Sequence, residues 1–132
     1  MSRHRVSVVD PFELPGWVGE KEVRWITETS LDGGHHVSGR LEAEPADGLQ
    51  TQPCDLLACD RAYPQPVLDE PSRAAAHQAW ALGEVRLLEY DGRLTLVVPG
   101  SAVTSELSLE ALRRLARAVG APSQRFSVVL RL

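Results

Sequence analysis

The densest group of side chains that could do chemistry lies between residues 55 and 77. It contains carboxylates, a guanidinium, a phenol and an imidazole, which are groups that proteins use for acid and base catalysis and for binding polar ligands. The group joins the end of an apolar strand to the first half of a helix, where pockets often form in α/β folds. Its members are Asp55, Asp60, Arg61, Tyr63, Asp69 and His77.

We select four members of this group as candidate binding residues: Asp60, Arg61, Tyr63 and His77. No residue is assigned a catalytic or metal-binding role. The alternative is that each group acts locally, with Asp60 and Arg61 as a solvated loop pair, Asp69 as the N-cap of a helix and His77 as an exposed helical residue.

Residues 10–19 follow a short strand and supply the fifth candidate. Two prolines and two glycines in this stretch predict a loop or a single helical turn. We expect Phe12, Leu14 and Trp17 to anchor it to the core. Trp17 is the candidate binding residue, because its indole could either close one end of the core or form the lip of a pocket.

The sequence contains no recognisable metal or cofactor motif. His35 and His36 are adjacent in a predicted strand, so they point to opposite faces and cannot readily share a metal ion. Cys54 and Cys59 lie five residues apart in another strand, which also places them on opposite faces. Two buried thiols are therefore expected in place of a disulfide. The sequence has neither HExxH nor paired CxxC spacing, and no glycine-rich phosphate loop, so no cofactor is predicted.

Composition and charge exclude several classes of partner. The 132 residues carry 14 Lys and Arg against 18 Asp and Glu, a net charge of −4. Nonspecific binding to nucleic acid requires that several phosphates be neutralised, so none is expected for this acidic protein. No run of about 18 apolar residues could cross a membrane, and no long apolar region follows the basic residues 1–5 as in a signal peptide. We expect a cytoplasmic protein with no membrane partner.

The clearest structural signal is a hairpin. Asp91-Gly92 is a preferred pair for a two-residue type I′ turn. This turn sets Tyr90 opposite Arg93 and Leu87 opposite Leu96, which places one apolar set of side chains on one face of the hairpin. That set is Val85, Leu87, Leu94, Leu96 and Val98.

An amphipathic helix is predicted after this hairpin. Thr104 or Ser105 can cap its start, and Gly120 ends it through a left-handed residue. Its apolar side chains recur at i, i+3, i+4 and i+7, which predicts one buried stripe. The stripe consists of Leu112, Leu115, Ala116 and Val119.

A second hairpin is predicted from the alternating stretches Glu22–Thr29 and His35–Glu44. A three-residue loop, residues 32–34, is preferred because it puts the apolar side chains of both strands on one side. We expect Gly39 to leave room for the indole of Trp25. The predicted pairs are Leu31 with His35, Thr29 with Val37, Thr27 with Gly39, Trp25 with Leu41 and Val23 with Ala43.

The remaining segments complete a single domain, residues 1–132. Hairpins dominate, so we predict an α+β fold with an antiparallel or mixed sheet of about seven strands and two helices packed on one face, in the order β-β-β-β-α-β-β-α-β. The other predicted segments are strands Val6–Val9, Cys54–Cys59 and Phe126–Leu132, an exposed loop Pro45–Pro53, and a helix from Asp69 or Glu70 to Gly83.

These observations support two hypotheses of function. The first is a non-catalytic protein-interaction module that acts as a homodimer, because a small sheet with open edges can protect them by pairing. Its partner would be a protein or a second copy of the chain. The alternative is a small-molecule-binding protein or minor enzyme that uses Asp60, Arg61, Tyr63 and His77.

Overall fold

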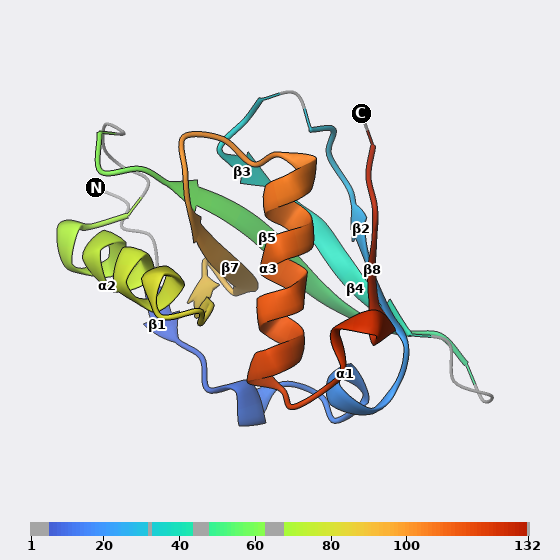
Figure 1. The fold of residues 1–132 in the computed structure, drawn as a ribbon. Coiled ribbons are helices and arrows are strands. Elements are labelled where there is room, and N and C mark those ends of the chain that lie inside the picture. Colours follow the sequence, from blue (N-terminus) through green and yellow to red (C-terminus); the bar gives the residue numbers. More distant parts are fainter. Residues whose placement is uncertain (1–5, 32, 44–47, 63–67, 132) are drawn as a thin grey trace.

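A computed structural model describes residues 6–31, 33–43, 48–62 and 68–131, and shows an α+β fold built on one mixed sheet (Figure 1). Within these residues the sheet has eight strands in the order β1-β6-β7-β5-β4-β2-β8, with β3 paired to β5. The strands are β1 (Val6–Val8), β2 (Val23–Thr27), β3 (His36–Val37), β4 (Gly39–Ala43), β5 (Gln50–Cys59), β6 (Arg86–Tyr90), β7 (Arg93–Pro99) and β8 (Phe126–Val129). The helices are α1 (Trp17–Glu20), α2 (Glu70–Ala81) and α3 (Ser105–Ala118), with 3-10 turns η1 (Pro11–Glu13) and η2 (Ser123–Arg125).

The hairpin of β6 and β7 confirms the predicted turn and register. Asp91 and Gly92 both have positive φ, 52° and 83°, as a type I′ turn requires. Tyr90 pairs with Arg93, and Leu87 pairs with Leu96. Because the turn fixes which residues face one another, the apolar set predicted for one face lies in the main core.

The hairpin of β2 and β4 is confirmed in register but not at its turn. Trp25 pairs with Leu41 as predicted, and the Cβ position of Gly39 would lie 2.7 Å from the indole. The predicted pairing of Thr29 with Val37 is wrong. The amides of Glu28 and Thr29 both donate to the Ser38 carbonyl, a bulge that ends the pairing with β2. The preceding residues form β3, which pairs with β5 instead.

The interior strand β5 is longer than predicted. It begins at Gln50, so the exposed loop predicted for Pro45–Pro53 is wrong in its last four residues, which pair with β4. Past Pro53, β5 runs parallel to β7 on one side and contacts β3 on the other. Because strands pair with it on both sides, the backbone N–H and C=O groups of β5 have hydrogen-bond partners without water. Residues 54–59 can therefore all be buried.

The prediction that both long helices share one face of the sheet is not confirmed. Leu56 of β5 packs in the core cluster that contains Leu112 and Leu115 of α3. Leu57 packs in a second cluster with Ala76 of α2. Because successive side chains of a strand point to opposite faces, α2 and α3 cover opposite faces of β5. Figure 1 shows α3 crossing in front of the sheet and α2 lying to its left.

The predicted element order is also incomplete at the N-terminal loop. Residues 10–20 form η1 and the short helix α1, which the predicted order lacks. Trp17 of α1 is 8% exposed and lies in the main core, but Phe12 of η1 is 95% exposed. The prediction that Phe12 anchors this loop is therefore wrong. At the other end of the chain, β8 is held in the sheet by parallel pairing with β2.

Candidate functional site

The candidate residues Asp60, Arg61 and His77 are used locally in the structure. His77 of α2 forms a hydrogen bond of 2.8 Å between its Nε2 and the Cys59 carbonyl oxygen. Asp60 Oδ1 accepts a hydrogen bond of 2.9 Å from the Ala62 amide. Arg61 is exposed. Among the described residues no hydrogen bond or ion pair joins any two of these three side chains, and the predicted contribution of Tyr63 lies outside the described residues.

Two further predictions for this region have clear outcomes. Asp69 is the N-cap of α2, since its Oδ1 accepts a hydrogen bond of 2.8 Å from the Ser72 amide. Trp17 packs inside the main core, which fits the interpretation that it closes one end of the core. In this polar group, Asp69 caps a helix and His77 joins that helix to the end of β5. Both roles are structural.

The strongest polar cluster centres on Asp55, which is 2% exposed. Arg93 of β7 donates to its carboxylate from Nε at 3.1 Å to both oxygens and from Nη2 at 3.0 Å to Oδ1. His36 of β3 lies with its Nε2 3.1 Å from Oδ2, and the Gly39 amide donates to Oδ1 at 3.3 Å. Arg93 Nη2 also reaches a carboxylate oxygen of Glu28 and the Gly39 carbonyl, each at 3.1 Å.

This cluster holds Asp55 in its charged form. Burial disfavours the carboxylate, but hydrogen bonds from His36, Arg93 and the Gly39 amide outweigh that cost and lower the pKa of Asp55 below its usual value of 3.8. An ionised carboxylate has about four positions that can accept hydrogen bonds, and four donor atoms already occupy them. The carboxylate thus ties β3, β4, β5 and β7 together.

Sequence reasoning included Asp55 in the polar group but missed its partners. Arg93 is 38 residues away along the chain, and the two meet only because β5 and β7 pair in parallel, with Asp55 opposite Thr95. No turn connects two parallel strands directly, so nothing local sets that register. The one available signal was the alternation of β7, which puts Arg93 and Thr95 on the face opposite the main core.

A different surface has the features of an interaction site. Strand β1 lies at one end of the sheet, with β6 as its neighbour among the described strands. All three of its residues are exposed, and Val6 and Val8 expose 38% and 62% of their surface. Phe12, which follows β1, is 95% exposed, and Leu82 after α2 is 68% exposed. Of these side chains, Val6 and Val8 belong to the edge strand itself, where another strand could pair.

Comparisons with known proteins add no assignment, because no family model, curated protein or solved structure matches this chain. Within the described residues there is no cluster of three or more His, Cys, Asp or Glu side chains arranged to hold a metal ion. The described helices are also too short or too polar to cross a bilayer. Among the described residues, the exposed edge strand β1 is the feature on which a proposal of function can rest.

Proposed function

We propose that this protein is a non-catalytic interaction module that acts as a homodimer, with β1 of one copy pairing antiparallel to β1 of the other. The observation that carries the proposal is that β1 has a neighbouring strand on one side only among the described residues, while Val6 and Val8 are exposed and the strand contains neither a charge nor a proline. Natural sheets usually protect an edge with such residues or cover it. An edge without them is suited to pairing with another strand.

The backbone of β1 supports this pairing. The Val9 amide donates to the Leu87 carbonyl of β6 at 3.0 Å, and Ser7 pairs with Glu89. In an antiparallel ladder the amides of alternate residues point the same way, so those of Ser7 and Val9 point to β6. The amides and carbonyls of Val6 and Val8 therefore point away from the sheet, where a second copy of β1 can satisfy them.

The opposite edge of the sheet is less suited to self-pairing. Strand β8 also exposes an apolar residue, Val129, at 48%. However, Arg125 precedes β8 and Arg131 follows it, and both are exposed. Antiparallel pairing of two β8 strands would bring these like charges close together, which is unfavourable. Neither strand has a charge within it, and Arg5 directly precedes β1, but Arg5 has no second arginine after β1 to approach, so we assign the dimer contact to β1.

Sedimentation velocity at micromolar concentration tests the proposal, with the wild type expected to be a dimer. Val8→Lys should give a monomer because it places a charge on the pairing edge. Val8→Pro should also give a monomer, because proline lacks the backbone amide that points outward at this position, while the hydrogen bonds to β6 remain. Val129→Lys is the matched control at the other edge and should stay dimeric. A monomeric wild type, or a Val8→Lys variant that remains dimeric, would show the proposal to be wrong.

A further inference from the structure

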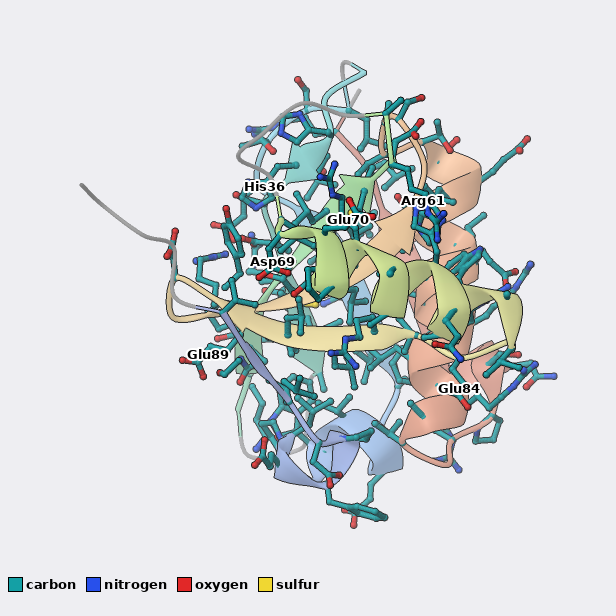
Figure 2. The ribbon with its side chains drawn as sticks, turned by 90° about the vertical axis from the view of Figure 1, so that its left-hand side faces the viewer. His36, Arg61, Asp69, Glu70, Glu84 and Glu89 are labelled. Atoms are coloured by element: carbon teal, nitrogen blue, oxygen red, sulfur yellow. The ribbon has the colours of Figure 1, made fainter. Side chains whose placement is uncertain are left out.

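A groove of about 400 Å³ lies beside β1. It is lined by Val85, which precedes β6, and by Leu87 of β6. Residues from the end of α2, the last turns of α3 and the segment that leaves β1 complete the lining. Figure 2 shows Glu84, on the rim, at the opposite end of α2 from Asp69 and Glu70. The groove is thus separate from the Asp60 region and from the Asp55 cluster. Its lining residues include Val8, Glu84, Arg86, Arg114, Arg117 and Ala118.

The lining combines aliphatic side chains with an excess of positive charge. Three arginines line the groove against one carboxylate, that of Glu84. Two of the arginines are already engaged: Arg114 donates to Glu110 and to the carbonyls of Trp80 and Glu84, and Arg117 donates to the Gly83 carbonyl at 3.1 Å. These two hold neighbouring segments of the lining together, whereas the third makes no such contact with the described residues.

That third arginine is Arg86, whose side chain has no hydrogen-bond partner in the part of the chain that the structure describes. Its Nε atom is buried and donates no hydrogen bond to a described residue. No described residue forms an ion pair with its guanidinium. A buried polar donor that is left unpaired costs free energy, and a charged one costs more. An anionic ligand in the groove would offset the unpaired charge of this guanidinium, because guanidinium and carboxylate groups form charge-assisted hydrogen bonds.

We propose that the groove binds a small amphiphilic carboxylate, with its carboxylate on Arg86 and its aliphatic chain along the apolar part of the lining, which includes Val8 and Ala118. The volume is within the range of small-molecule sites, and a mostly apolar lining with few polar groups is their usual composition. The apolar lining accounts for the chain of the ligand, and the unpartnered guanidinium accounts for its charge. This site goes beyond the proposed dimer and does not depend on it, since Arg86 lies one strand inward from the pairing edge.

The test uses decanoate as the probe in isothermal titration calorimetry with the full chain. Wild type should bind decanoate saturably, and should bind decanol more weakly because decanol has the same chain without the charge. Arg86→Met keeps the aliphatic stem but removes the guanidinium, so it should weaken decanoate binding about tenfold or more and leave decanol binding unchanged. Arg113→Met is the matched control on α3, because Arg113 is exposed and does not line the groove.

A second variant locates the site independently of charge. Ala118→Trp adds bulk to the groove at a half-buried position, and should weaken the binding of both decanoate and decanol. Absence of saturable decanoate binding by the wild type overturns the proposal, as does equal decanoate affinity in the wild type and Arg86→Met. Sedimentation of the same samples separates this result from the dimer, because Arg86→Met leaves the β1 edge intact and is expected to sediment like the wild type.

Discussion

Arg93 holds the buried carboxylate of Asp55 through three hydrogen bonds of 3.0 to 3.1 Å, although the two residues are 38 positions apart in the chain. Arg93 also binds Glu28 and the Gly39 carbonyl, so one guanidinium connects the segment after β2 with β4, β5 and β7. The pair lies on the same face of β5 as Leu57, which packs with Ala76 of α2 in the second core cluster. Its contribution to stability leads to the first two predictions.

Replacing Asp55 by asparagine should lower the free energy of unfolding by about 2 to 3 kcal/mol at neutral pH. The amide is similar in size, but it loses the charge-assisted hydrogen bonds and brings two donors into a position surrounded by donors. Urea denaturation measures the change. Asp60→Asn is the matched control, because the asparagine side-chain oxygen can still accept the hydrogen bond from the Ala62 amide in this exposed loop. Its free energy of unfolding should change by no more than about 0.5 kcal/mol.

The stability contributed by Asp55 should depend on pH in a defined direction. Its folded pKa lies below the usual value of 3.8, so the unfolded chain takes up the proton first as the pH falls. The contribution is complete above the unfolded pKa of about 3.9 and is lost as the pH falls through the lower folded value. Urea titrations of wild type and Asp55→Asn should therefore converge below about pH 4. A stability difference that stays constant down to about pH 2 would contradict this assignment.

Substituting alanine for Gly39 should destabilise the fold by about 1 to 3 kcal/mol, because the added methyl group would overlap a fully buried indole. Its Cβ would lie 2.7 Å from Trp25 and 2.8 Å from the Ile26 carbonyl oxygen. Gly16→Ala is the control, since Gly16 has φ of −57° and the added Cβ would lie 4.0 Å from Glu20 Oε1, an ordinary contact distance. Thermal unfolding should show a lower midpoint for Gly39→Ala and a nearly unchanged one for Gly16→Ala.

The two cysteines should be unreactive in the folded protein. Both are free and buried, as the sequence predicted, and they lie in different core clusters on opposite faces of β5. Burial raises the pKa of Cys59 to about 11 and raises that of Cys54 further, so little thiolate exists near pH 8. Ellman's reagent should react slowly with the native protein and release two equivalents at once in urea. Rapid labelling of either native thiol would contradict the structure.

Arg114 should contribute more to stability than its neighbour Arg113. Its guanidinium carbon lies 3.6 Å from the centre of the Trp80 ring, and its Nε donates to Glu110 at 2.7 Å. It also binds the Trp80 and Glu84 carbonyls, which attaches α3 to the turn between α2 and β6. Arg114→Met should cost about 1 to 3 kcal/mol in urea denaturation. Arg113→Met should have a small effect, because its contact with Glu110 is long and exposed.

The candidate site shows where sequence reasoning reached its limit. Asp60, Arg61 and His77 were grouped because they are close in sequence, yet closeness along a strand-to-helix connection does not set the direction of a side chain. Arg86 stands in a predicted strand, and no sequence motif marks it as a binding residue. The groove beside it forms from β1, α2, β6 and α3, so no local pattern could reveal it.

The sequence by itself determined the elements whose instructions are local. The Asp91-Gly92 turn specifies the register of β6 and β7, and the apolar stripe of α3 with its Thr104 cap specifies that helix. Only the tertiary structure decided that β5 pairs in parallel with β7, that α2 and α3 lie on opposite faces, and that Asp55 meets Arg93. These arrangements depend on contacts between segments joined by long crossovers, where no turn sets the register and burial of the whole core selects it.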